Sequence, residues 1–132
     1  MNQEQSMSML DAQAAEVGIR ELVRRLNAGL GVTLVGGLTG SPVRGISSDW
    51  QKVNGPEPSP EAQQRLRLAH RVWRIISDAE GEHVARLWFI GSNPWLNDDS
   101  PVNATREDRA EDLIHAQDKS QANSHVRATL EI

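Results

Sequence analysis

Apolar residues recur at helical spacing along most of the chain. Between residues 10 and 30 they return every three to five positions, which fits the stripe of a helix, at Leu10, Ala14, Val17, Leu22, Leu26 and Leu30. Gly31 follows the stripe directly, as glycine often does after the last residue of a helix. Residues 10–30 are therefore predicted to form an amphipathic helix.

Two short helices are predicted next, separated by a glycine. Thr33 can cap a first helix that ends at Gly40 and buries Leu34, Val35 and Leu38. Ser41 and Pro42 then supply an N-cap and a first-turn proline for a second helix, which would bury Val43, Ile46 and Trp50. A short helix, a glycine turn and another short helix have the spacing of a helix-turn-helix.

If the second short helix is a recognition helix, its outward side chains face DNA. Arginine and lysine suit phosphates or guanine, glutamine can read adenine, and serine can donate to phosphate. The outward set is Arg44, Ser47, Ser48, Gln51 and Lys52. Against this, Asp49 would repel phosphate, and each of Gly36, Gly37 and Gly45 weakens its helix by about 1 kcal/mol relative to alanine. The segment is interpreted either as a DNA contact or as a helical hairpin that only completes the core.

A long and strongly apolar helix is predicted from Pro60 to Asp78. Its two apolar stripes cover more than half of the circumference, one made of Leu66, Ala69, Trp73 and Ile76 and the other of Leu68, Val72 and Ile75. Such a helix touches neighbours on two sides, and its surplus apolar surface favours a homodimer. The remaining face carries Arg67, Arg71 and Arg74, which fit either a solvated face or an anchor for phosphate or an acidic partner.

The C-terminal third is predicted to consist of helices with short joints. A helix over residues 79–90 would turn Val84, Leu87, Trp88 and Ile90 inward and end at Gly91. Asn93-Pro94 and Ser100-Pro101 are two further pairs of N-cap and proline. Thr105, with Asp108 three residues later, resembles a capping box for a last helix that ends near Asp118. Residues 1–9 and 119–132 are expected to be flexible tails, with a short strand as the alternative for the last residues.

Composition excludes several kinds of site. The chain has no cysteine, so disulfides and thiolate metal sites are excluded, and its four histidines lack ligand spacing. We expect neither a metal nor a cofactor. The sequence has no Gly-rich phosphate loop and no Ser/His/Asp motif, so we do not expect an enzyme. No apolar run approaches the roughly 18 residues of a membrane span, and no signal peptide is evident, so a cytoplasmic protein without membrane contact is expected.

Charge is distributed unevenly. The net charge is −4, which makes the whole chain a poor nonspecific polyanion binder, so any nucleic-acid contact must come from a local patch. Residues 65–74 carry four arginines and no acid, whereas residues 98–118 carry seven acids and two arginines. The acidic group of Asp98, Asp99, Glu107, Asp108, Glu111 and Asp112 fits either a solvated helix face or a surface that competes for a phosphate-binding pocket.

One order of motifs resembles a known family. "SSDW" ends the segment with helix-turn-helix spacing, a Pro-rich joint precedes "RLRLAHRVWRII", and "ARLWFIGSNPWLNDDSPV" leads into an acidic helix. This order resembles the actinobacterial branch of the Xre/MbcA/ParS-type antitoxins over residues 20–118. Asn93, Pro94, Leu96 and Ser100-Pro101 match the family motif, whereas Asn97-Asp98-Asp99 stands where many relatives have Gly-Gly-Arg.

The resemblance implies an all-α protein with an N-terminal helix-turn-helix-like bundle (residues 10–56) and a small C-terminal helical domain (residues 57–118). The first would bind promoter DNA. The second would bind a toxin, usually a RES-type enzyme that consumes NAD. The expected partner-binding residues are Asn93, Pro94, Trp95, Leu96, Asp98, Asp99 and Arg106. Of this stretch, Leu96 and Val102 are expected to tuck inward.

Two other functions stay open on the sequence. One is a stand-alone dimeric transcriptional regulator without a toxin partner, for which a phage origin is one option. The other is a protein-interaction module whose helix-turn-helix has lost DNA binding.

Overall fold

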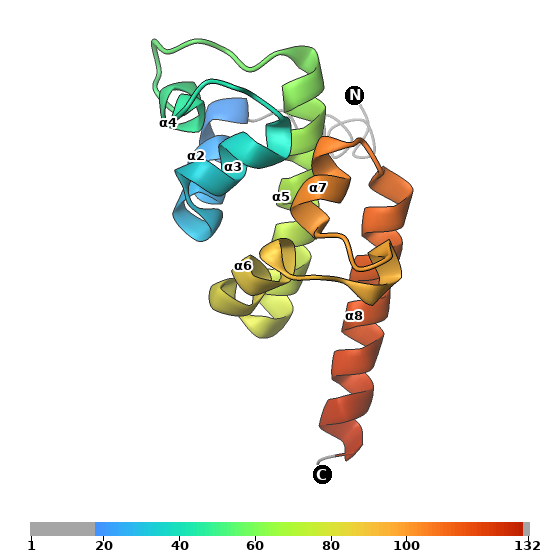
Figure 1. Ribbon diagram of the computed structural model, residues 1–132. Coiled ribbons are helices and arrows are strands. Elements are labelled where there is room, and N and C mark those ends of the chain that lie inside the picture. Colours follow the sequence, from blue (N-terminus) through green and yellow to red (C-terminus); the bar gives the residue numbers. More distant parts are fainter. Residues whose placement is uncertain (1–17, 131–132) are drawn as a thin grey trace, which may run out of the picture.

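The helices of the computed structural model are gathered around one central helix, α5 (Pro60–Glu80) (Figure 1). The structure describes the backbone of residues 18–130 and the side chains of residues 18–122. Within residues 18–130 every regular element is a helix, which confirms the all-α prediction. In Figure 1, α2 (Ile19–Leu30) and α3 (Val32–Thr39) lie to the left of α5 and α8 (Ala110–Leu130) lies to its right, while α7 (Pro101–Arg106) packs against both α3 and α5.

The first two described helices meet at a single glycine. α2 ends at Leu30 and α3 begins at Val32, with Gly31 between them at φ 93°, a value that suits glycine. The predicted end of the first helix is confirmed, and so is a short helix that ends at Gly40. Residues 10–17 of the first predicted helix lie outside the described part of the chain.

The third N-terminal helix begins later than predicted. α4 (Ile46–Trp50) starts after Gly45, whose φ of 73° lies in the left-handed region, so the helix cannot extend back to Pro42. Val43 is consequently 56 % exposed and is not part of the buried face. Trp50 is buried as expected, and Ile46 packs against the core.

α5 begins where its sequence predicts. The Ser59 hydroxyl accepts a hydrogen bond from the Ala62 amide at 3.1 Å, and Pro60 occupies the first turn. The stripe of Leu66, Ala69, Trp73 and Ile76 is buried, as predicted. The second stripe is covered unevenly, because Val72 is buried whereas Ile75 is 38 % exposed.

The core extends from α2 to α8 without a break. Its buried members come from every described α-helix, among them Leu26, Leu38, Leu66, Phe89, Val102 and Leu113. The predicted boundary between residues 56 and 57 falls in the loop that joins α4 to α5. The segments on either side of this loop therefore share one core.

α6 (Glu82–Ile90) turns a different face inward from the one predicted. Gly81, at φ 97°, separates it from α5, and the buried residues are Ala85 and Phe89. Val84, Leu87 and Ile90 are between 41 % and 52 % exposed, so their inward placement was wrong. Trp88 is half-buried, and its indole nitrogen donates to the Ser120 hydroxyl of α8 at 2.9 Å.

The C-terminal helices differ from the prediction in two respects, the role of Thr105 and the length of α8. Thr105 is buried inside α7, where its hydroxyl donates to the Pro101 carbonyl at 2.8 Å, so it does not cap a new helix. The break falls at Asp108, which has a φ of 60°, and α8 begins at Ala110. α8 continues to Leu130, so the backbone expected to be a flexible tail is helical up to that residue. Figure 1 shows the end of α8 projecting beyond the other helices.

α2 approaches α5 closely because residue 29 has no side chain. A Cβ placed on Gly29 would lie 2.5 Å from Cζ2 and 2.7 Å from Cε2 of the Trp73 indole. Trp73 is buried beneath α2 and cannot retreat without displacing other core residues. By contrast, a Cβ on Gly36, within α3, would meet nothing within 4 Å.

These two glycines should respond to alanine in opposite directions. Gly29→Ala should lower the free energy of unfolding, because overpacking costs about 1–3 kcal/mol and outweighs the gain of about 1 kcal/mol in helix propensity. Gly36→Ala should raise it by about 0.5–1 kcal/mol, because nothing opposes that gain. Urea unfolding of both variants measures the difference. An increase in stability for Gly29→Ala would show that the two helices are not held at this distance.

Candidate functional site

Residues 93–99 form a closed turn between α6 and α7, which we call the tryptophan turn. The Asn93 side-chain carbonyl accepts from the Trp95 amide at 2.9 Å and caps η1 (Pro94–Leu96). The Asn93 backbone carbonyl accepts from the amides of Leu96 and Asp98, each at 2.9 Å, and the Asn93 amide donates to the Asp99 carbonyl at 3.1 Å. Asn93, at the start of the turn, is therefore hydrogen-bonded to its middle and to its last residue.

Two successive left-handed residues reverse the chain inside the turn. Asn97 and Asp98 have φ values of 56° and 67°, and asparagine and aspartate tolerate this region better than most residues that carry a side chain. Leu96 is buried and anchors the turn to the core, as predicted, and Val102 is buried after it. The turn is thus fixed by backbone bonds on one side and by packing on the other.

Asp99 binds the frame of the turn. Its carboxylate accepts from the Ser100 amide at 2.8 Å, from the Asn103 side chain at 2.9 Å and from Arg109 at 3.4 Å. The hydrogen bond from Asn103 is the main cause that lowers the pKa of Asp99, followed by the bond from the Ser100 amide. Asp99 is committed to these groups and Asn93 is buried, so both position the site and do not face a partner.

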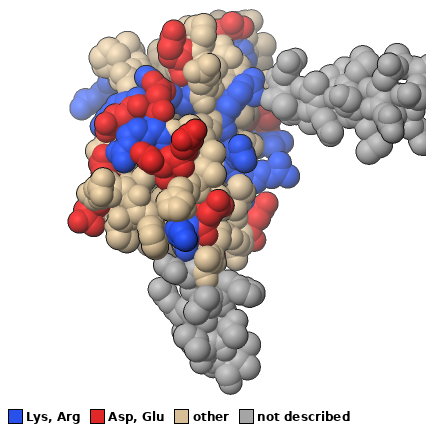
Figure 2. All heavy atoms as spheres, turned by 90° about the vertical axis from the view of Figure 1, so that its right-hand side faces the viewer, with Lys and Arg blue, Asp and Glu red and all other residues tan. Residues whose placement is uncertain are grey.

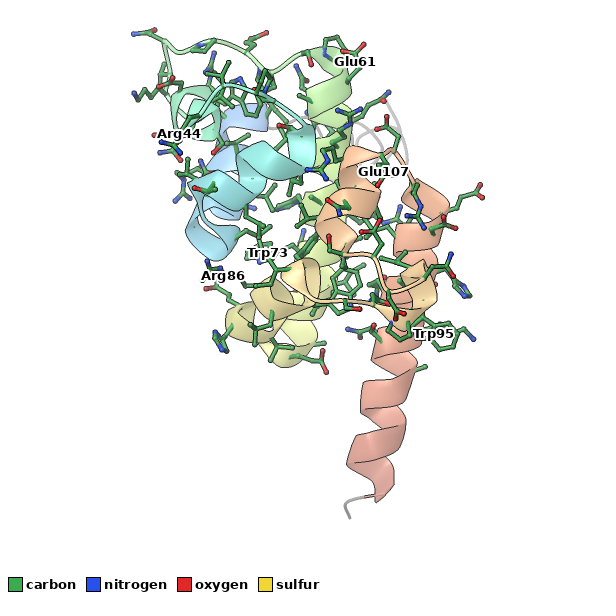
Figure 3. All side chains as sticks on the ribbon, in the orientation of Figure 1. Arg44, Glu61, Trp73, Arg86, Trp95 and Glu107 are labelled. Atoms are coloured by element: carbon green, nitrogen blue, oxygen red, sulfur yellow. The ribbon has the colours of Figure 1, made fainter. Side chains whose placement is uncertain are left out.

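Trp95 stands outside the core on this frame. Its side chain is 43 % exposed, and Figure 3 shows it beside α8, pointing away from the bundle. The His115 ring meets it edge-on with centroids 5.9 Å apart, and the Lys119 ammonium lies 5.5 Å from the ring centroid. These two α8 residues support one side of the indole and leave the rest open.

The remaining predicted partner-binding residues are divided between two places. Pro94 and Asp98 are exposed on the tryptophan turn with Trp95. Arg106 lies at the far end of α7, where its guanidinium donates to the Asn103 side chain and its aliphatic stem approaches Gly40. Figure 3 labels Glu107, the next residue, well above Trp95. The structure therefore brings Pro94, Trp95 and Asp98 together and leaves Arg106 apart.

The predicted DNA-contacting residues are also divided. Ser47 is fully buried, and its hydroxyl donates to the Val32 carbonyl at 2.9 Å, so it cannot face DNA. Ser48 is half-buried. Arg44, Gln51 and Lys52 are exposed around the five-residue α4, and Arg44 precedes the helix (Figure 3). Lys52 pairs with Asp49 at 3.0 Å, and both side chains are largely exposed.

Arg20 holds the segment that follows α4, a role that the sequence did not reveal. Its guanidinium donates to the carbonyls of Trp50 at 3.1 Å and of Gly55 at 2.8 Å, and it also contacts the carbonyls of Lys52 and Pro56. Carbonyls after a helix need donors, and a planar guanidinium serves several at once. No local pattern marks Arg20, because all of its partners are at least thirty residues away.

Arg65 joins three helices at the joint before α8 and was also missed. Its guanidinium makes two bonds of 2.9 Å to Asp108 and one of 2.7 Å to the Thr39 carbonyl at the end of α3. The side-chain bonds from Arg65 lower the pKa of Asp108. The left-handed backbone of Asp108 turns its carboxylate toward α5, because the chain reverses there between α7 and α8.

The acidic C-terminal region is partly neutralised. Asp99 and Asp112 pair with Arg109, and Asp108 pairs with Arg65. Figure 2, which faces the side of the molecule that carries α7 and α8, shows acidic and basic side chains intermingled there. Among the predicted acidic group, Asp98, Glu107 and Glu111 are exposed and take no part in the ion pairs found among the described residues.

Comparisons of the chain with protein-family models, with curated proteins and with solved structures found no match. No helix within residues 18–130 is long and apolar enough to cross a membrane. In the same part of the chain, no three histidine or acidic side chains are grouped as a metal site would require.

The ion pair between Asp108 and Arg65 should make the free energy of unfolding depend on pH. The pKa of Asp108 is lowered on folding, so the pair stabilises the protein above the ordinary value of 3.8, and this contribution is lost as the pH falls below it toward the folded pKa. Asp108→Asn keeps a residue that accepts the left-handed backbone but removes the pair. We expect this variant to be less stable than wild type at neutral pH, with the gap closing on acidification.

Thermal unfolding of wild type and Asp108→Asn between about pH 7 and pH 3 measures this gap. Glu111→Gln is the matched control, because Glu111 is exposed and takes no part in the ion pairs found among the described residues. A gap between wild type and Asp108→Asn that stays constant across the pH range would contradict the assignment.

Proposed function

We propose that this chain is an antitoxin-like protein that binds a partner protein through the tryptophan turn. The observation that carries the proposal is the exposure of Trp95 on a turn whose backbone is fixed. Tryptophan is enriched among the residues that dominate binding energy at interfaces. An exposed indole has an energetic cost in water that burial in a partner's pocket would remove.

The rigidity of the turn supports the proposal further. Binding loses free energy when side chains and loops must be ordered, so a surface that is ordered beforehand binds more tightly. Here Asn93 and Asp99 close the turn, Leu96 anchors it, and His115 and Lys119 hold the indole from one side. The turn thus offers Trp95 in one orientation.

The proposed partner is a RES-type toxin that consumes NAD, as the family resemblance implies. A pocket for NAD must accommodate a diphosphate and therefore needs basic groups or helix N-termini. Asp98 lies beside Trp95 on the turn, and Glu111 is exposed on α8 one turn before His115, whose ring meets the Trp95 indole. These carboxylates would complement such a pocket, whereas the acids already paired to Arg65 and Arg109 would not.

Replacing Trp95 should separate binding from folding. Trp95→Ala should keep the helical circular dichroism and a melting temperature close to wild type, because nearly half of the side chain is in solvent. Partner affinity should fall by about 2 kcal/mol or more, roughly thirtyfold, as for an interface hot spot. A pull-down from the native host, followed by titration of the captured toxin, measures this loss.

Val53→Ala is the control, because Val53 is 84 % exposed on a different part of the surface. Val53→Ala should bind like wild type. A large drop in melting temperature for Trp95→Ala would place the indole in the core, and an unchanged affinity would remove it from the interface.

We also propose promoter binding through the N-terminal helices as a second function of the same chain. The observation that favours it is the exposure of Arg44, Gln51 and Lys52 around α4, on a segment that Arg20 and Asn27 fasten to α2. Arginine and lysine would contact phosphates, and glutamine could read a base edge. Of the five predicted contact residues, three are exposed, Ser48 is half-buried and Ser47 is excluded because it is buried.

Removing two of these charges should weaken DNA binding in a salt-dependent way. Arg44→Ala with Lys52→Ala should lower affinity for the protein's own promoter and reduce the slope of log affinity against log salt by about 2. Arg86→Glu changes the net charge by the same amount on α6 and should leave the slope unchanged. Mobility shifts over a salt series test this, and equal slopes for wild type and the double variant would remove α4 from the DNA contact.

A homodimer remains part of the proposal, supported by a different surface from the one predicted. Most of the apolar face of α5 is covered by neighbouring helices, with Ile75 the more exposed exception. Val84, Leu87 and Ile90 of α6 are the larger group of exposed apolar side chains. A second copy of the chain would remove this surface from water.

A further inference from the structure

Four arginines from two helices form a group that we call the arginine band, and the charges of three of them act on the half-buried His70. Arg67, Arg71 and Arg74 follow one another along the outer face of α5 at spacings of four and three residues, and Arg25 comes from α2. The ring centroid of His70 lies 6.0 Å from that of Trp73. The band belongs neither to α4 nor to the tryptophan turn.

The pKa of His70 indicates that arginines of both helices lie near its ring. Burial lowers the pKa of His70, and the charges of Arg25, Arg74 and Arg67 lower it further. Three guanidinium groups from α2 and α5 therefore lie close enough to disfavour a fourth positive charge between them. The surface around His70 is electropositive although the whole chain carries a net charge of −4.

The acids that pair with Arg25 and Arg74 are partly exposed. Glu21 pairs with Arg25 at 3.1 Å, and Asp78 lies 3.8 Å from Arg74, with more than a third of each of these side chains in solvent. Ion pairs this exposed contribute little and exchange readily with other anions. Arg71 is exposed and takes no part in the ion pairs found among the described residues.

We propose that the arginine band binds the phosphate backbone of a nucleic acid. Seven residues of helix rise about 10 Å, so Arg67, Arg71 and Arg74 present one cation about every 5 Å along a line. A nucleic-acid strand presents a regular row of negative charges at comparable spacing, and guanidinium groups bind phosphate through two parallel hydrogen bonds.

The band and α4 are both connected to α2. Asn27 donates to the Ser47 carbonyl and to the Gln51 side chain of α4, two residues after Arg25 in the same helix. Residues two apart in a helix project from different faces, so the band and α4 are separate contacts on different faces of α2. The proposal rests on the proposed promoter binding for its natural ligand, but the phosphate contact itself is separate from α4.

Binding to a fluorescein-labelled 20-base-pair duplex of arbitrary sequence, followed by anisotropy over a salt series, tests the band. Arg71→Ala with Arg74→Ala should weaken binding about tenfold at low salt and reduce the slope of log affinity against log salt by about 2. Arg71→Lys with Arg74→Lys should retain most of the slope, because the charges remain. Arg86→Glu, which changes the net charge equally on α6, should behave as wild type.

A second measurement reads the site directly. On addition of the duplex, the ring resonances of His70 should move in NMR spectra, whereas those of His83, exposed on α6, should not. Wild-type protein that fails to bind the duplex at low salt would overturn the proposal. So would equal salt slopes for wild type and the Arg71→Ala, Arg74→Ala variant.

The two DNA proposals can fail separately. If binding to arbitrary duplex depends on Arg71 and Arg74 but the wild-type protein shows no preference for its own promoter, the band stands and promoter recognition by α4 fails. If promoter binding depends on Arg44 and Lys52 but is indifferent to Arg71 and Arg74, the band fails and α4 stands.

Discussion

The close contact between α2 and Trp73 of α5 is the constraint on which the rest of the fold depends. With no side chain at Gly29, the backbone of α2 lies against the indole, and α5 can turn its buried stripe toward α2, α3 and α6 together. The positions of α4 and of the joint before α8 then follow from two arginines that span between helices. Arg20 of α2 donates to the carbonyls of the segment after α4. Arg65 of α5 binds both Thr39, at the end of α3, and Asp108, just before α8.

The parts predicted well from the sequence are those fixed by neighbouring residues. Ser59-Pro60, Asn93-Pro94 and Ser100-Pro101 all begin helices as expected, because an N-cap and a proline act within one turn. The long stripe of α5 was also clear, since its period repeats over about three turns, from Leu66 to Ile76. The local sequence pattern could not show that Gly45 adopts a left-handed conformation. It also could not show that α6 turns Ala85 and Phe89 toward the protein core and leaves Val84 and Leu87 exposed. The face of a short helix is decided by the elements that it meets.

The same division applies to the candidate site. The sequence indicated the stretch around Trp95 because its capping pairs and its exposed-looking tryptophan stand together in the chain. It did not separate the residues that build the turn from those that the turn displays, because Asp98 and Asp99 look alike in sequence. In the structure Asp99 is bound by Ser100, Asn103 and Arg109, whereas Asp98 is left in solvent by a left-handed backbone. Arg20 and Arg65 escaped notice because their partners are remote in the chain.

In the tryptophan turn, the residues that fix the backbone differ from those whose side chains are exposed. Its fixed contacts come from main-chain groups together with Asn93, Leu96 and Asp99, while the side chains at positions 94, 95 and 98 point into solvent. Position 95 differs from the other two, because Pro94 begins η1 and position 98 needs a residue that tolerates the left-handed region. If the turn binds a partner as proposed, substitution at position 95 would change the partner that is recognised while the backbone of the turn stays the same.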